Sequence, residues 1–239
     1  MPYLSRNDIE RIAADVIRDY RKLPALQGQE LERISPQLLI QMLGLTVEYW
    51  QLSLDGSLLG VTSCRKAIAP IYVDGEPDYL PIDEKTLLID SSLNTVRANI
   101  GRRNFTLTHE ACHQILFMLY PQEYRQSAKL FYYSTRTRPF DNWEEWRANA
   151  LTAAVLMPAD IVRRNMRKCG IGEKIIRLNR WFAGLEYEAF CNVAATMRVS
   201  REALAIRMQQ LGLLERNELA NPLKGAAITM DDDELTLFS

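Results

Sequence analysis

The spacing of apolar positions predicts two helices in the first part of the chain. From residue 7 to residue 20, apolar side chains recur every three to four positions, which predicts an amphipathic helix with Ser5 or Asn7 as its N-cap. The pair Ser35-Pro36 predicts the start of a second, shorter helix, and Gly44 predicts its end. Each of these helices is expected to pack one face against a core.

Four runs rich in β-forming residues follow the second helix. Thr46–Leu54 and Leu58–Ser63 flank the pair Asp55-Gly56, which is typical of a hairpin turn. Ile68–Val73 and Thr86–Asp90 predict two more strands, and the polar residues between them, including two prolines, predict a loop. The pattern therefore indicates a small, mostly antiparallel sheet.

The second half of the chain is mainly helical by its pattern. Residues 120–140 lack clear periodicity and are too many for a simple connection, which predicts a short helix with a loop or a functional lid. Residues 142–158 predict a long helix that stops at a proline, and residues 161–214 read as helical, with Ser200 opening and Gly212 closing the last helix. The fold class expected from these elements is α+β.

Composition limits the kinds of partner that the chain can recruit. With 29 basic and 30 acidic residues the net charge is −1, so no global field attracts nucleic acid or membrane. No apolar run approaches twenty residues and the N-terminal segment lacks a signal-peptide pattern, which predicts a cytoplasmic protein without a membrane partner. The four cysteines have no CxxC spacing and are expected to be free thiols.

The only two histidines of the chain, His109 and His113, are four residues apart in a helix predicted over Thr106–Leu119, with Asn104 or Thr106 as its N-cap. Residues four apart share one helical face, and Glu110 follows the first histidine, which completes the HExxH pattern. That chemistry uses two imidazoles as metal ligands and the carboxylate as general base. Two randomly placed histidines would show this spacing in roughly one chain in a hundred. The pattern therefore favours a metal site.

A catalytic zinc usually takes three protein ligands, and without a third histidine the remaining ligand must be a carboxylate or a thiolate. Glu145 is the candidate on the next helix, and Asn149 lies one turn later, where it could accept a hydrogen bond from a ligand histidine. Glu145 also fits a capping box, and Glu144 and Asp141 are neighbouring alternatives. Spacing alone leaves the third ligand open.

Three segments resemble the ImmA/IrrE family of bacterial metallopeptidases. They are GRRNFTLTHEACHQILF, EWRANALTAAVLMP and VSREALAIRMQQLGL. The family carries a Phe-Thr lead into HExxH, a Glu three residues before Ala-Asn, and a stretch that ends Leu-Met-Pro. The matching positions are Phe105-Thr106, His109 to His113, Glu145, Ala148-Asn149 and Leu156-Met157-Pro158. The resemblance follows the order of elements over residues 1–215 and is specific over 101–158 and 199–213.

The resemblance implies a zincin-like fold with His109, His113 and Glu145 as zinc ligands and Glu110 as the base. It divides the chain into a metallopeptidase core (1–158) and a helical region that completes the cleft (159–215), while the pattern from Glu215 onward is loop-like and predicts a mobile acidic tail (216–239). It also implies a gluzincin-like endopeptidase that cuts a helix-turn-helix repressor encoded nearby, in stress-response, mobile-element or anti-phage systems.

Several residues are candidates for supporting roles. An oxyanion donor is expected, with four candidates: Tyr132, Tyr133, Tyr187 and Arg207. The strand Thr86–Asp90, as an edge strand, could pair with an extended substrate. Cys64 could reach the zinc as an inhibitory thiolate, whereas Cys112, where many relatives carry Gly, is expected to pack as a small buried residue against the sheet.

Positive charge concentrates just after the predicted zinc helix, where one glutamate offsets seven basic residues. They are Arg163, Arg164, Arg167, Lys168, Lys174, Arg177 and Arg180. Such a cluster is usually a solvated helix face, but it could bind a nucleic-acid backbone, and some relatives are thought to respond to single-stranded DNA.

Two alternatives to an active peptidase remain. One is a non-catalytic DNA-binding or regulatory module of the same fold. The other is a pseudo-enzyme, which the intact Glu110 argues against.

Overall fold

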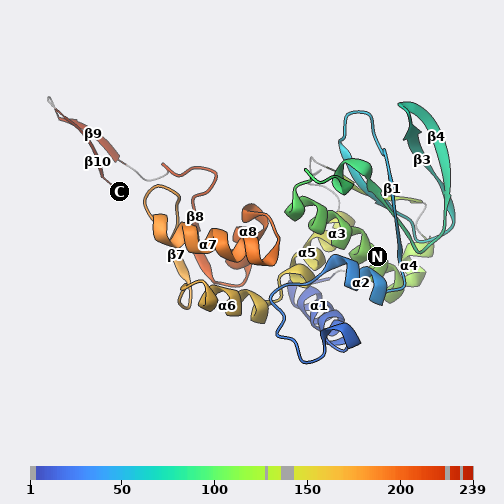
Figure 1. Cartoon of the computed structure of the whole chain (residues 1–239), viewed down its shortest axis with the longest axis horizontal. Coiled ribbons are helices and arrows are strands. Elements are labelled where there is room, and N and C mark those ends of the chain that lie inside the picture. The colour runs from blue at the N-terminus through green and yellow to red at the C-terminus, as the bar shows by residue number, and fades with distance from the viewer. Residues whose placement is uncertain (1–3, 127–128, 136–142, 224–226, 232–233, 239) are drawn as a thin grey trace. The chain divides into compact units, whose positions relative to one another are not determined.

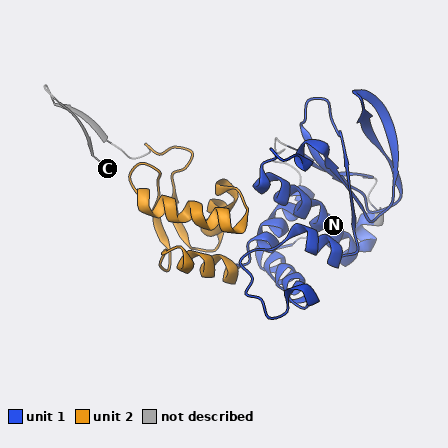
Figure 2. Cartoon of the chain, in the orientation of Figure 1, with its two compact units in different colours: residues 1–158 blue, residues 159–239 orange. Residues whose placement is uncertain are grey.

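The computed structural model describes residues 4–126, 129–135, 143–223, 227–231 and 234–238. The chain divides into two compact units, residues 1–158 and residues 159–239, which are coloured separately in Figure 2. The class is α+β, as predicted (Figure 1). In the described part of the chain, no helix combines the length and apolar character that a membrane span requires.

The first unit begins with two helices whose caps are encoded locally. Helix α1 (Arg6–Tyr20) starts at Ser5, and the side chains of Ser5 and Asp8 bond to each other's backbone amides in a capping box. After the short 3₁₀ helix η1 (Pro24–Leu26), helix α2 (Pro36–Met42) is capped by Ser35. The predicted N-caps Ser5 and Ser35 are thus both confirmed.

A four-stranded mixed sheet has the order β1-β5-β2-β6. Its strands are β1 (Thr46–Trp50), β5 (Thr86–Asp90), β2 (Leu58–Thr62) and β6 (Tyr132–Thr135). The predicted hairpin at Asp55-Gly56 is wrong, because β1 pairs in parallel with β5 while β2 pairs antiparallel with both β5 and β6. The prediction that β5 is an edge strand is also wrong, since it lies between β1 and β2.

The hairpin of this unit instead joins β3 (Ala67–Val73) to β4 (Glu76–Ile82). Its two central residues, Asp74 and Gly75, have φ of 53° and 85°, the left-handed conformation that tight hairpin turns require. The sequence pattern predicts a loop at β4 because of Pro77 and Pro81, but a strand tolerates prolines here, since in the described sheets β4 pairs with β3 alone. One face of the ribbon packs on the sheet through a shared apolar core of Leu52, Val61, Ala69, Ile71, Ile82 and Leu88.

Helix α3 (Ile100–Leu119) is the central element of the first unit (Figure 1). It follows η2 (Ser91–Asn94) and is capped by Asn99, so it starts earlier than the predicted caps Asn104 and Thr106. All residues from Thr106 to Phe117 are buried, because the sheet strands β2, β5 and β6 contact the helix, as do α2 and α5. A helix enclosed on all sides must bury whatever polar groups it carries.

The segment after α3 is more regular than its pattern suggested. It contains α4 (Pro121–Gln126) and strand β6, and the remainder of the predicted 120–140 stretch lies largely outside the described residues. Helix α5 (Trp143–Leu156) then packs along α3 and α1 and ends just before Pro158, as predicted.

The second unit contains helices α6 (Ala159–Lys168), α7 (Gly184–Met197) and α8 (Arg201–Gln210). The prediction that 161–214 is entirely helical is wrong at β7 (Ile175–Leu178), which pairs in parallel with β8 (Leu214–Asn217). Ser200 caps α8, as predicted.

The tail, expected to be loop-like from Glu215, contains part of β8 and then an antiparallel pair. This pair is formed by β9 (Ala227–Asp231) and β10 (Glu234–Phe238).

Candidate metal centre

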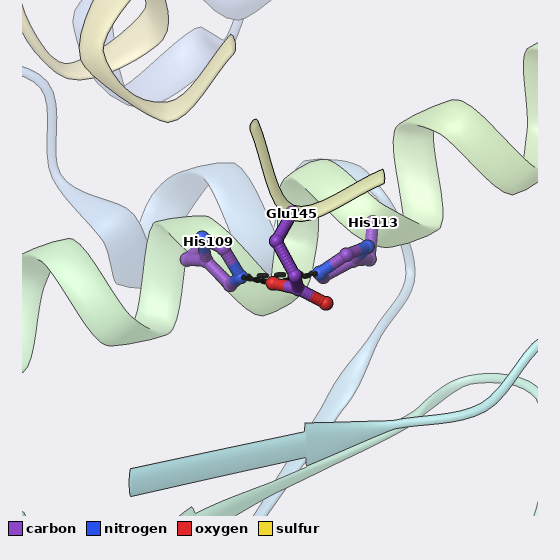
Figure 3. Close-up of side chains that lie close together, drawn as sticks. All are labelled: His109, His113 and Glu145. Carbon is purple, nitrogen blue, oxygen red and sulfur yellow. Dashed lines mark hydrogen bonds and ion pairs between the residues drawn. The ribbon is translucent and has the colours of Figure 1, made fainter. Parts of the chain in front are cut away.

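The two histidines of α3 lie one helical turn apart on one face (Figure 3). Their Nε2 atoms are 3.1 Å from each other. The side chains of His109 and His113 are only 3% and 0% exposed, because this part of the helix is enclosed. The HExxH motif therefore brings two imidazole nitrogens to a single buried point.

Glu145 of α5 supplies a third ligand atom at the same point (Figure 3). Its Oε2 lies 3.1 Å from Nε2 of His109 and 3.4 Å from Nε2 of His113. Two alternatives to Glu145 were Glu144 and Asp141. Oε2 of Glu144 pairs with Nζ of Lys129 at 3.1 Å, and Asp141 lies outside the described residues. Among the described residues, Glu145 is thus the third member of the group, and the buried residues His109, His113 and Glu145 could hold a metal ion.

The size of this triangle fits a metal ion. Ligands about 2.0–2.1 Å from a tetrahedral zinc lie about 3.3 Å from one another. The three separations here are 3.1, 3.1 and 3.4 Å. The donor set of two imidazoles and one carboxylate also matches known three-ligand catalytic sites. Distance and donor chemistry therefore agree.

The protonation states of His113 and Glu145 are those that a cation needs. Burial lowers the pKa of His113 to about 4, so its imidazole is neutral at pH 7. Burial opposes ionisation of Glu145, but hydrogen bonds from His109 and His113 outweigh it and hold the pKa of this carboxyl well below its usual range. The site thus presents a neutral nitrogen from His113 and a charged oxygen from Glu145.

The orientation of the two imidazoles is set by aromatic packing. The ring of His109 stacks on Phe105, and the ring of His113 contacts Phe117 and Tyr132 with a centroid distance of 5.2 Å to Tyr132. Neither Nδ1 atom has a hydrogen-bond partner among the described residues. The predicted bond from a ligand histidine to Asn149 is therefore absent, because packed rings rather than an amide hold the imidazoles.

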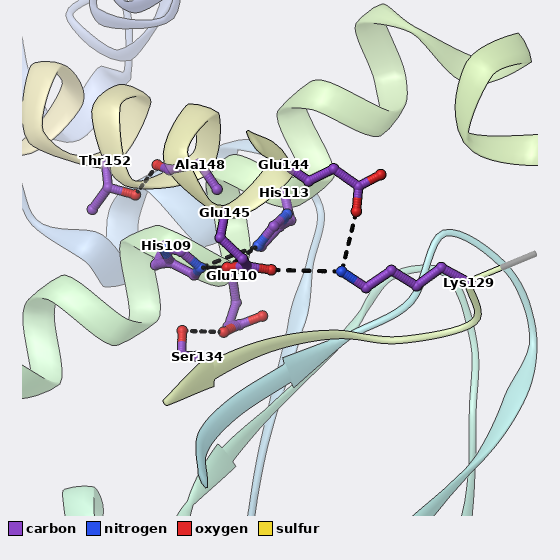
Figure 4. A network of polar contacts seen from close by, with 9 residues as sticks. All are labelled: His109, Glu110, His113, Lys129, Ser134, Glu144, Glu145, Ala148 and Thr152. Carbon is purple, nitrogen blue, oxygen red and sulfur yellow. Dashed lines mark hydrogen bonds and ion pairs between the residues drawn. The ribbon is translucent and has the colours of Figure 1, made fainter. Parts of the chain in front are cut away.

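Glu110 lies next to the triangle on α3 and is fully buried. The hydroxyl of Ser134, on β6, donates to its Oε1 at 2.6 Å (Figure 4). Burial raises the pKa of Glu110 well above its ordinary value, and the nearby charge of Glu145 adds to this rise, while the Ser134 bond opposes it. A carboxyl with a raised pKa and one oxygen held in place suits a group that accepts a proton.

Lys129 connects the segment before β6 to α5 (Figure 4). Its Nζ lies 3.1 Å from Glu144, 3.9 Å from Oε1 of Glu145 and 4.4 Å from the ring centre of Tyr132. Lys129 therefore brings positive charge to the carboxylates beside the histidines.

The sequence pattern does not predict three neighbours of the site: Lys129, Ser134 and Gly60. Lys129 pairs with Glu144, Ser134 donates to Glu110, and Gly60 lies against the side chain of Glu110. No spacing rule connects the lysine or the serine to α3. Gly60 did carry a signal, because a glycine within a predicted strand often marks a close approach of another group.

Cys64 and Cys112 do not join the metal group. The Sγ of Cys64 donates to the carbonyl of Tyr124 at 3.8 Å, and this residue lines a cavity of about 250 Å³ together with Gln114 and Phe117. Cys112 is buried as predicted and bonds to Thr152 of α5, and burial raises its pKa to about 12. The predicted inhibitory thiolate of Cys64 is therefore not at the site.

The predicted oxyanion candidates fall into two groups. Tyr132 is fully buried against His113, whereas Tyr133, its neighbour on β6, is partly exposed. Tyr187 and Arg207 belong to the second unit, where Arg201 donates to the hydroxyl of Tyr187 at 2.6 Å and Arg207 is buried. Among the described residues of the first unit, Tyr132 is the candidate that contacts His113.

Comparison with known proteins identifies no family for this chain. No family model matches this chain, and no curated protein matches it either.

Proposed function

We propose that this protein is a cytoplasmic, zinc-dependent endopeptidase. The observation that carries the proposal is the convergence, at one buried point, of both HExxH histidines, the carboxylate of Glu145 and, beside them, a buried Glu110. These are the ligand types of a catalytic zinc and the residue type of its general base. The resemblance to the ImmA/IrrE family supports the same reading.

Each residue has a separate task in this proposal. His109, His113 and Glu145 would hold the zinc, which when bound supplies a Lewis acid and lowers the pKa of water. Glu110 would take one proton from the attacking water as its oxygen adds to the peptide carbon, and would pass that proton to the amine as the C–N bond breaks. Lys129, close to both acidic groups of α5, would limit the excess negative charge there.

The proposed substrate is a helix-turn-helix repressor, which rests on the family resemblance. Strand β6 supports an extended peptide as the form that is cut, because it lies at one edge of the described sheet and carries Ser134 next to Glu110. We therefore propose β6, and not the central strand Thr86–Asp90, as the strand that pairs with the substrate.

The test is the metal content of three purified proteins. Wild type is expected to hold close to one zinc per chain after purification without chelators, and Glu145→Ala is expected to lose most of it. Glu144→Ala is the matched control, because it removes the adjacent carboxylate that bonds to Lys129 and not to the histidines. Wild type without zinc, or equal zinc in wild type and Glu145→Ala, would contradict the proposed ligand set.

A second candidate function, nucleic-acid binding, is favoured by the second unit. Helix α7 ends at Met197, Arg198 adopts a left-handed conformation with φ of 54°, and α8 begins at Arg201. Two helices joined by so short a turn are typical of helix-turn-helix modules. Fluorescent single-stranded and duplex oligonucleotides provide the test, with affinity expected to fall as salt rises; binding that is insensitive to salt would argue against a backbone contact.

A further inference from the structure

The carboxylate of Glu110 is fixed by two residues that face each other across the β2–β6 ladder. Gly60 and Ser134 are a register pair of these antiparallel strands. Ser134 donates its hydroxyl to Oε1 of Glu110 at 2.6 Å. The bond is charge-assisted when Glu110 is ionised, which makes it stronger than a bond between neutral groups.

Gly60 provides the space in which this carboxylate lies. A Cβ atom at position 60 would lie 2.5 Å from Oε1 and 2.9 Å from both Cδ and Cγ of Glu110. Real Cβ atoms do not approach so closely. Any side chain at this position would therefore displace the carboxylate, so the glycine and the serine act on the same oxygen.

The other oxygen of Glu110 remains available. Oε2 is buried and has no hydrogen-bond partner in the described part of the chain. Buried carboxylate oxygens are normally satisfied, because an unmade bond leaves the cost of removing the group from water uncompensated. The arrangement therefore separates the two oxygens: one is anchored to the sheet and the other is left to accept a proton.

We propose that Ser134 is a positioning residue, which together with Gly60 fixes Oε1 of Glu110 and presents Oε2 as the proton acceptor. This inference rests on the proposed peptidase function, because it assigns a cause to the orientation of its base. Strand β6 then has a second role besides pairing with the substrate: by pairing with β2 it places the Ser134 hydroxyl at Oε1 of Glu110.

The variants Ser134→Ala, Ser134→Thr and Thr95→Ala test this role. On a library of quenched-fluorescent peptides, Ser134→Ala is expected to lower kcat roughly tenfold to a hundredfold, which is the effect of losing one hydrogen bond to a charged group. Its KM and zinc content are expected to stay at wild-type values, and Ser134→Thr should recover most of kcat because it restores the hydroxyl. Thr95→Ala is the control, because it removes a hydroxyl that donates to the carbonyl of Ser92, outside the site.

A structural readout separates this inference from the peptidase proposal. Crystal structures of zinc-loaded wild type and Ser134→Ala should show Oε1 of Glu110 held at Ser134 in the first and a reoriented carboxylate in the second. If wild type cuts no peptide, the peptidase proposal fails while the structures still test the positioning. An unchanged carboxylate in Ser134→Ala, or an active wild type whose kcat Ser134→Ala leaves unchanged, would overturn the role of Ser134.

Discussion

Replacing Gly60 by alanine perturbs Glu110 without touching any proposed metal ligand. The added methyl group would lie 2.5 Å from Oε1, whereas ordinary contacts begin at 3.4 Å, so the carboxylate must move by about 0.9 Å. The backbone of β2 cannot move away easily, because it is paired with β5 on one side and β6 on the other. The carboxylate therefore takes up most of the displacement and weakens its bond to Ser134.

A displacement of this size is expected to be costly for catalysis. A misplacement of about 1 Å can lower a rate about a hundredfold, which corresponds to roughly 2.7 kcal/mol of transition-state stabilisation. The assay is kcat/KM on quenched-fluorescent peptides, measured beside zinc content, which is expected to stay near one per chain.

Gly172→Ala is the control for this substitution, because a Cβ atom there meets nothing within 4 Å. Wild-type kcat/KM in Gly60→Ala, with Glu110 still in its original place in a crystal structure, would refute the steric reasoning.

Three further predictions concern the base, the metal and the first helix. Glu110→Gln keeps the shape of the buried side chain but removes its proton acceptor, so hydrolysis should fall at least roughly a hundredfold while zinc is retained; wild-type turnover would exclude this role. Wild type treated with a chelator should have a Tm about 5–11 °C lower than wild type in zinc at a hundred times its Kd, as measured in a thermal scan. In Glu145→Ala, most of this difference between the two conditions should disappear. Asp8 has a lowered pKa because Ser5 donates hydrogen bonds to it. Its stabilising effect is fully present above pH 3.8 and is lost as pH falls through its lower folded pKa, so urea unfolding of wild type and Asp8→Asn should differ at pH 6 and converge in strong acid.

Local patterns predicted those parts of the fold whose causes are local. Ser5, Ser35 and Ser200 were predicted as caps because an N-cap depends on its own side chain and the next turn. The two histidines were predicted to share a face because helical geometry alone brings residues four apart together.

Strand pairing was predicted less well, because it depends on residues distant in sequence. The pair Asp55-Gly56 has turn chemistry, yet β1 finds its partner in β5, some forty residues later. Strand β4 was missed because its two prolines weaken a strand pattern that pairing with β3 overrides. Glu145 lies beside the two histidines because α5 packs along α3, a contact between helices that are distant in sequence.

The ligand triangle joins two helices that are far apart along the chain. His113 and Glu145 are separated by 32 positions, which include α4 and β6. A bound ion would close this stretch into a loop, and the chain-entropy relation for a cross-link of this length gives about 4 kcal/mol. Loss of the ion would therefore lower the stability of the protein and raise the fraction of molecules that proteases can cut. The abundance of this protein in the cell, and not only its activity, would then follow the supply of metal.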